Sequence, residues 1–331
     1  MESPTFIEVC SGCGGLSTGF MNVGWNAILL NEFIPTFSAT LKRNHPDTKI
    51  ETKDMQQLDL SPFIGKADVL MGGVPCQSYS HSGHRMGLED PRGKLILDFN
   101  RLVIQTCPKI LMVENVEGLL THNGGESLKS ILELFKNQGA YHVYYKLLNA
   151  GHYEVPQKRK RVFIVGVRDD IWRAKGEFKY PEPSSNTVLL RHVLISCPPG
   201  PGMQYPEAKR QIMDLVPQGG CWVNLPDGVK ERYMGEKGMA AGGGKRGVAR
   251  RLAMDEQSLT LTTSPCQKQT ERCHPLETRP LSVREYARIQ TFPDSYIFEG
   301  SIANQYKQIG NAVPVKLAEA MGRQIKKYLE L

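Results

Sequence analysis

Short apolar runs alternate with amphipathic segments along the first half of the chain, and this alternation constrains the fold more than any other feature. The apolar runs predict strands at 5–9, 26–30, near 50, 69–76, 110–113, 142–148 and 162–167. Helical patterns lie between them at 16–23, 37–44, 95–106 and 128–137. Strands that alternate with helices in this way form a parallel sheet covered by helices. We therefore predict an α/β fold for this part of the chain.

Five polar or glycine-rich features come directly after predicted strands. They are the segment Ser11-Gly12-Cys13-Gly14-Gly15 and the residues Glu32, Asp54, Cys76 and Glu114. In an open α/β sheet, ligands bind in the crevice outside the carboxyl ends of the strands. We therefore expect these features to meet in one site, although each alone has a simpler interpretation as a turn, a capping acid or a small buried thiol.

Cys76 follows the sequence Gly72-Gly73-Val74-Pro75. Two glycines and a proline end a strand sharply, so we expect the cysteine on a tight turn at the end of a strand. Such a turn displays a thiolate, which is the nucleophilic form of cysteine. Cys76 is therefore our candidate nucleophile.

The glycine-rich segment resembles a dinucleotide-binding loop, but Ser17 stands where the third glycine of that pattern would fall. Glu32, at the end of the second predicted strand, is placed to accept hydrogen bonds from two ribose hydroxyls. Asp54, at the next strand end, is placed to meet an adenine amino group. No basic residue of the glycine segment would offset phosphates, which favours S-adenosylmethionine over a nicotinamide dinucleotide.

Two arginines precede the last predicted strand, in the sequence Gln157-Lys158-Arg159-Lys160-Arg161. Alternation along an extended chain places Gln157, Arg159 and Arg161 on one face and the lysines on the other. We expect the two arginines to face the crevice, toward a phosphate or a carbonyl oxygen. The alternative is a charged entrance to a strand.

The second half of the chain has a different character. Glycine and proline are frequent between about 186 and 280, where 13 Lys and Arg face 9 Asp and Glu in a chain of net charge +7. The stretch 237–254 contains basic residues and no acidic ones, as phosphate contacts require, although a solvated loop has the same composition. A helical stripe of apolar residues returns at 315–329.

Six motifs stand in an order that resembles a known family. They are Ser11–Leu16, Gly73–Gln77, Glu114–Val116, Gln157–Arg161, Arg284–Arg288 with Gln290–Pro293, and Gly310–Pro314. The set resembles the DNA (cytosine-5)-methyltransferases of the small bacterial restriction–modification type, over nearly the whole chain. One departure is that Cys10 and Leu16 stand where the family often has phenylalanine; Phe33 offers an aromatic face instead.

The resemblance implies a Rossmann-like sheet that transfers a methyl group from S-adenosylmethionine to carbon 5 of a flipped-out cytosine in a short specific duplex sequence. Cys76 would add to carbon 6, Glu114 would hydrogen-bond or protonate ring nitrogen 3, and Arg161 would hold the base carbonyl oxygen with Arg159 nearby. The catalytic and cofactor-binding domain would comprise 1–185 and 305–331. The smaller, loop-rich target-recognition domain and hinge would comprise 186–304.

The resemblance also implies two sets of binding residues. The cofactor set is Ser11, Gly12, Cys13, Gly14, Gly15, Leu16, Glu32, Phe33, Asp54, Met55 and Asn311. The DNA-binding set is Gln77, Ser80, Arg92, Lys245, Arg246, Arg250 and Arg251. No metal is expected, since the pair Cys10 and Cys13 has no second pair at ligand spacing.

Duplex DNA is the expected partner, with a cognate restriction endonuclease acting on the same site, and a monomer is expected. Eight cysteines without a signal peptide or membrane-spanning run indicate the reducing bacterial cytoplasm. Three alternatives stay open at this point. They are a tRNA cytosine-5 methyltransferase of the same fold, a catalytically inactive DNA-binding relative, and a nicotinamide-dependent oxidoreductase.

Overall fold

A computed structural model describes residues 3–74, 91–240 and 247–330, with only the backbone described at 91–94, 236, 237 and 240. Contacts divide the chain into two compact units. Unit 1 comprises Met1–Tyr153, Lys160–Ser184 and Val313–Leu331, and unit 2 comprises Glu154–Arg159 and Ser185–Ala312.

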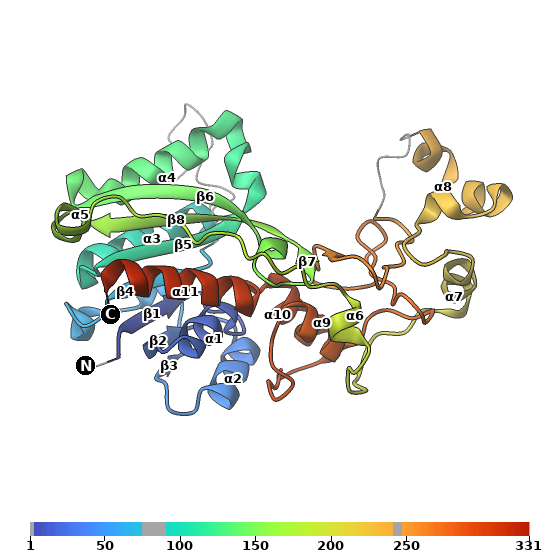
Figure 1. The fold of residues 1–331 in the computed structure, drawn as a ribbon, viewed down its shortest axis with the longest axis horizontal. Coiled ribbons are helices and arrows are strands. Elements are labelled where there is room, and N and C mark those ends of the chain that lie inside the picture. The colour runs from blue at the N-terminus through green and yellow to red at the C-terminus, as the bar shows by residue number, and fades with distance from the viewer. Residues whose placement is uncertain (1–2, 75–90, 241–246, 331) are drawn as a thin grey trace. The chain divides into compact units, whose positions relative to one another are not determined.

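A seven-stranded sheet forms the centre of unit 1, in the order β3-β2-β1-β4-β5-β8-β6 (Figure 1). The strands are β1 (Thr5–Val9), β2 (Asn26–Asn31), β3 (Ile50–Glu51), β4 (Val69–Gly72), β5 (Ile110–Val116), β6 (Tyr141–Asn149) and β8 (Lys160–Arg168). The pairs from β3 to β5 are parallel, as predicted, but β8 is antiparallel to both β5 and β6. Only residues 150–159 connect β6 to β8, which is shorter than a parallel crossover requires.

Helices cover both faces of this sheet. Apolar side chains of β1, β4 and β5 pack in one core with α3 (Pro91–Thr106) and α4 (Glu126–Lys136), whose Phe99 and Phe135 rings lie 5.7 Å apart. On the opposite face, Phe6 of β1 packs against Phe20 of α1 (Gly15–Asn22), with ring centroids 5.6 Å apart. The helix α11 (Val315–Leu329) lies beside α1 (Figure 1) and has the predicted bounds.

The remaining helices of unit 1 are α2 (Pro35–Asn44) and α5 (Asp169–Lys175). Helix bounds agree with the predicted ranges within a few residues, since local periodicity determines them. Two strand ends differ from the prediction by three residues or more. The strand predicted at 69–76 ends at Gly72 within the described residues, and β5 extends past the predicted end at 113 to Val116 because β8 pairs with it through Arg161.

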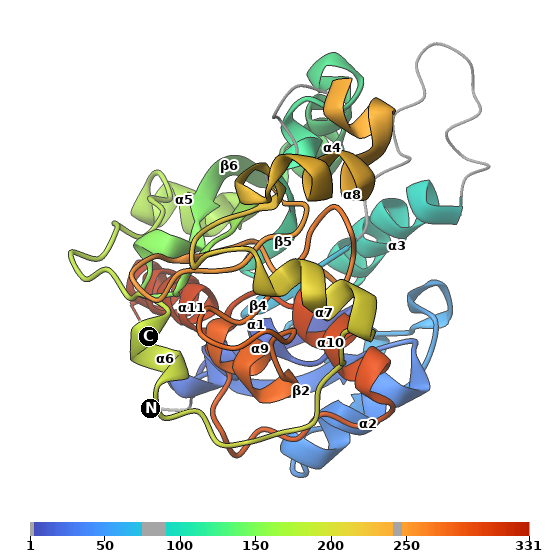
Figure 2. The ribbon, with the colours of Figure 1, turned by 90° about the vertical axis from the view of Figure 1, so that its right-hand side faces the viewer.

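Unit 2 consists largely of irregular backbone with short elements. These are the parallel pair β7 (Gln157–Lys158) and β9 (Ser258–Leu259), and the helices α6 (Arg191–Leu194), α7 (Glu207–Asp214), α8 (Asp227–Ala240), α9 (Val283–Ile289) and α10 (Ile302–Asn311). Figure 2 shows α7 and α8. They contribute, with Trp222, Val248 and Cys273, to a separate apolar core. The predicted boundary at 305 would divide α10, which lies wholly within unit 2.

No helix in the described part of the chain is both long and apolar enough to cross a membrane.

Candidate active site

The glycine-rich segment turns the chain from β1 into α1. Gly12 and Gly14 have φ angles of 58° and 83°, a conformation that glycine adopts without strain. The Ser11 amide donates to the Asn31 carbonyl at 2.9 Å, and the Gly14 amide donates to the Ser11 carbonyl at 2.8 Å. A Cβ atom at Gly12 would meet no atom within 4 Å, so there is open space over the turn.

Glu32 lies against this turn at the end of β2. Its Oε2 accepts the Gly12 amide and its Oε1 accepts the Ile34 amide, both at 2.8 Å. Burial raises the pKa of Glu32, and these two backbone amides, with that of Phe33, oppose the shift. Each oxygen keeps a second lone pair, so the carboxylate retains acceptors for two further hydroxyl donors. Phe33 beside it is 65% exposed, unusual for a large apolar ring.

Asp54 and Met55 follow β3, the next strand of the sheet. Asp54 uses its Oδ1 to accept the Gln56 amide at 2.9 Å, capping a short 3₁₀ turn at Met55–Gln57. Met55 is 3% exposed, and its side chain packs in the apolar core. The cofactor roles of Asp54 and Met55 stay predictions. The side chains of Cys13 and Leu16 are likewise buried.

A polar group lies at the end of β5. The Arg161 Nε lies 2.8 Å from the Glu114 Oε1, and both side chains are nearly buried. The Asn115 side-chain amide donates to the Val74 carbonyl at 2.8 Å. A Cβ atom at Gly73 would lie 3.5 Å from the Glu114 Oε2. The segment that leads into Cys76 is therefore attached beside the carboxylate of Glu114.

A comparison with known protein families identifies the kind of enzyme that has this arrangement. The model of C-5 cytosine-specific DNA methylases matches residues 4–327. The chain belongs to this family. The methylase is 44% identical over 334 residues to the type II methyltransferase M.Eco47II of Escherichia coli, covering 98% of this chain and 79% of that protein. It is also 44% identical over 326 residues to M.Sau96I of Staphylococcus aureus, covering 97% of this chain and 75% of that protein.

Solved structures show the same fold. A DNA modification methyltransferase encoded within an E. coli prophage superposes with a TM-score of 0.73 at 23% identity, covering 99% of this chain and all (100%) of that one. Dnmt2 of S. pombe superposes with a TM-score of 0.67 at 16% identity, covering 99% and 100% of the two chains. The predicted α/β methyltransferase fold and the predicted enzyme class are confirmed. The chain is a DNA cytosine-5 methyltransferase of the type II restriction–modification kind.

Arg159 of the methylase lies in unit 2 and donates to backbone carbonyls there. The predicted alternation is present, because Gln157 and Arg159 are buried whereas Lys158 and Lys160 are exposed. However, Arg159 is 1% exposed, and its guanidinium donates to the backbone carbonyls of Leu261 at 3.0 Å and Gly310 at 2.9 Å, within unit 2. Its place in the crevice stays a prediction.

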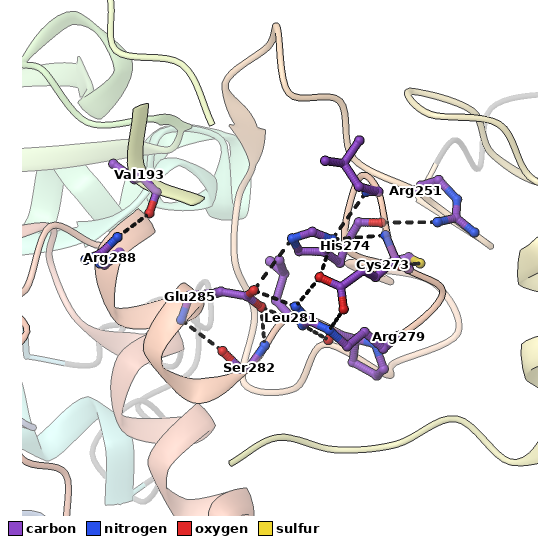
Figure 3. Close-up of polar contacts among 12 residues, drawn as sticks. Val193, Arg251, Cys273, His274, Arg279, Leu281, Ser282, Glu285 and Arg288 are labelled. Carbon is purple, nitrogen blue, oxygen red and sulfur yellow. Dashed lines mark hydrogen bonds and ion pairs between the residues drawn. The ribbon is translucent and has the colours of Figure 1, made fainter. Parts of the chain in front are cut away.

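The sequence predicts Arg251 as a DNA-binding residue, but its side chain is buried in unit 2. It is 5% exposed, and it donates to the carbonyls of Val216 and Met213, both at 2.7 Å. A third bond reaches the carbonyl of His274, beside which Arg251 lies in Figure 3. Arg250 is mostly buried and lies 3.7 Å from the carboxylate of Glu256. Arg251 stabilises the loops of unit 2, and its donors are not available to a DNA phosphate.

The remaining predicted residues are not tested by this geometry. Cys76, Gln77, Ser80, Lys245 and Arg246, and the side chain of Arg92, lie outside the described residues. Asn311 is exposed at the end of α10 in unit 2. Its cofactor role stays a prediction.

Sequence reasoning missed two residues of unit 1. Asn115 lies within the motif Glu114–Val116, but the sequence predicts no role for it, since its bond to Val74 depends on the pairing of two strands distant in sequence. Glu8 is 2% exposed in the middle of β1, and burial raises its pKa to about 8, only partly opposed by the hydroxyl and backbone amide of Ser17. A glutamate inside the apolar run Thr5–Val9 was the available signal.

Proposed function

We propose that this methylase transfers a methyl group from S-adenosylmethionine to carbon 5 of a flipped-out cytosine, within a short specific duplex sequence and through a covalent adduct of Cys76. The observation that carries the proposal is the attachment of Gly73 and Val74 beside Glu114. Cys76 is only two residues further along the chain, so the candidate nucleophile and the candidate acid belong to one site.

The residues around the glycine turn fit an adenosine. Glu32 retains acceptors for the two ribose hydroxyls, Phe33 offers an exposed ring to the adenine, and the space over Gly12 admits a ligand close to the backbone. Ser11, the glycines and the backbone of Met55 would complete the pocket. When bound, S-adenosylmethionine supplies an electrophilic methyl group on a sulfonium.

The roles of the protein side chains follow from the chemistry of cytosine, whose carbon 5 is a poor nucleophile. The Cys76 thiolate forms a bond to carbon 6, and the electron pair of the 5,6 double bond becomes available at carbon 5. Glu114 donates a hydrogen bond or a proton to ring nitrogen 3, which receives negative charge during the addition. Once carbon 5 carries the methyl group, its proton passes to a base, the electron pair of that bond restores the 5,6 double bond, and the carbon–sulfur bond breaks to return the Cys76 thiolate.

Arg161 is proposed to hold both Glu114 and the base. Its Nε contacts the Glu114 carboxylate at 2.8 Å and its Nη1 donates to the Lys160 carbonyl at 2.7 Å. These contacts fix the plane of the guanidinium and leave Nη2 for the carbonyl oxygen of the cytosine. Arg159 would act at a distance, as a positioning residue of unit 2.

Unit 2 is proposed to recognise the target sequence. A cytosine within a duplex cannot present carbon 6 to a thiolate, so the base must leave the stack. Loops with backbone freedom and basic side chains, as in unit 2, suit contacts to base edges and phosphates. A cognate restriction endonuclease and a monomeric state are parts of the same proposal.

The test is methyl transfer from labelled S-adenosylmethionine to duplex DNA and, separately, to tRNA. Bisulfite sequencing of plasmid DNA from cells that express the enzyme then identifies the methylated cytosines. We expect label in DNA at one short sequence. Label in tRNA alone would instead support the tRNA alternative.

A further inference from the structure

Unit 2 contains a solvent-open cavity of about 770 Å³, bordered by α7, α8 and the segment 266–271. Figure 2 shows the two helices that border it. Side chains that line it include Tyr205, Lys209, Arg232, Tyr233, Lys268 and Glu271. None of these has a role in the site described above.

A lysine and a buried glutamate form the inner wall. The Glu271 side chain is fully buried, and its Oε2 lies 2.7 Å from the Nζ of Lys209. Lys209 also donates to the hydroxyl of Tyr233 and lies 4.6 Å from the centroid of that ring. Burial acts to lower the pKa of Lys209, but the carboxylate of Glu271 and the Tyr233 hydroxyl outweigh it and the pKa is raised. Lys209 is therefore charged, and Glu271 offsets its charge.

Two further cations lie at the exposed side of the cavity. The Lys268 Nζ is 5.2 Å from the Tyr233 ring centroid and donates to the Tyr233 carbonyl at 3.5 Å. The Arg232 Nε donates to the Gly228 carbonyl at 3.0 Å. Within the described ranges, no carboxylate forms an ion pair with either residue. An aromatic face and a carbonyl hold a cation in place without neutralising it.

We propose that this cavity binds a phosphodiester of the DNA backbone through Lys268 and Arg232. Cations that are held in position and not neutralised suit an anionic ligand, and arginine and lysine are the usual partners of phosphate oxygens. The inference rests on the duplex DNA substrate of the proposed function. Such a contact would set the position of unit 2 on the duplex without reading its sequence.

The experiment measures the dissociation constant of duplex DNA over a series of salt concentrations, for the wild type, Lys268→Ala and Arg232→Ala. Each phosphate contact that is lost should reduce the log–log salt slope by about 0.9. Binding to target and unrelated duplexes should weaken by the same factor. Both side chains are exposed, and thermal unfolding of each variant verifies that the fold is retained.

Arg210→Ala is the matched control, because Arg210 follows Lys209 on α7 but pairs with Glu207 at 3.0 Å. Its salt slope should equal that of the wild type. An unchanged slope in both test variants would overturn the inference. A loss of affinity for the target duplex alone would also overturn the inference, since that result indicates base recognition. A wild-type enzyme that binds no duplex DNA would refute the proposed function itself.

Discussion

At the scale of single residues, two buried glutamates near the glycine turn differ in what stabilises their charge. Glu32 accepts two backbone amides at 2.8 Å, whereas Glu8 lies deeper, with 2% of its surface exposed and the charge of Glu32 as an unfavourable neighbour. A buried carboxyl that is not paired with a cation favours its neutral form. The two side chains should therefore respond differently to pH and to substitution.

Glu8 should make the enzyme less stable as pH rises. Burial raises its pKa in the folded state to about 8, from 4.5. Between these values the folded state holds a proton that the unfolded state has released, so the free energy of unfolding falls by about 1.4 kcal/mol per pH unit from this group. Glu8→Gln should remove that slope. Denaturant unfolding of both proteins from pH 5 to 9 measures it, and parallel curves would contradict the assignment.

Glu32→Ala should weaken binding of S-adenosylmethionine. Hydrogen bonds to a charged acceptor contribute about 1.5–3 kcal/mol, which corresponds to a roughly 10- to 100-fold rise in the dissociation constant. Isothermal titration calorimetry measures the change. Glu133→Ala, at an exposed position that pairs with Lys136, is the control and should bind as the wild type does. Equal affinities in all three proteins would exclude Glu32 from the ribose contact.

At the scale of elements, α1 and α11 approach so closely that glycine is required at their contact. A Cβ atom at Gly19 would lie 2.4 Å from the Ala318 Cβ and 2.6 Å from the Val315 carbonyl oxygen. Backbone atoms cannot move aside as a flexible side chain does. The contact also attaches the last helix of the chain to the helix that follows the glycine turn.

Gly19→Ala should therefore lower the free energy of unfolding by about 1–3 kcal/mol, the usual effect of overpacking. Gly228→Ala is the matched control, since a Cβ atom there meets nothing within 4 Å. It should leave stability unchanged or raise it by up to about 1 kcal/mol. Urea unfolding compares the two, and equal effects would show that the close approach has no energetic consequence.

Helices and strands could be predicted from the sequence where residues close together along the chain determine them. The spacing of apolar residues determines α11, and its bounds agree with the prediction. The extension of β5 to Val116 depends instead on its pairing with β8, because Arg161, the partner of Val116, lies 45 residues further along the chain. Whether Arg159 and Arg251 face solvent likewise depends on carbonyl groups from distant loops. Charge and alternation contain no information on such partners.

At the scale of the whole molecule, the chain passes from one unit to the other between Arg159 and Lys160. Arg159 thus belongs to unit 2 and Arg161 to unit 1, although two positions separate them. Their partners differ accordingly, since Arg159 donates to backbone carbonyls and Arg161 contacts Glu114. One sequence motif therefore supplies a structural residue and a proposed catalytic residue.

Substitution should separate these two roles. Arg159→Ala leaves two buried carbonyls without their donor, at a cost of about 1–3 kcal/mol for each, and should lower the melting temperature. The melting temperature of Arg161→Ala should lie nearer to that of the wild type. This variant should nevertheless lose methyl transfer at temperatures where it is fully folded. Calorimetric melting and a labelled methyl-transfer assay distinguish them. A folded Arg161→Ala enzyme with full activity would remove Arg161 from the site.

The covalent step tests the central claim most directly. A duplex with 5-fluorocytosine at the target should accept the methyl group and then retain the enzyme, because fluorine cannot leave carbon 5 as a proton does. We expect a complex that survives denaturing electrophoresis, requires S-adenosylmethionine and is absent from Cys76→Ser. Cys107→Ser, at an exposed free cysteine, should form it normally. A complex that persists in Cys76→Ser, or maps to another cysteine, would contradict the account.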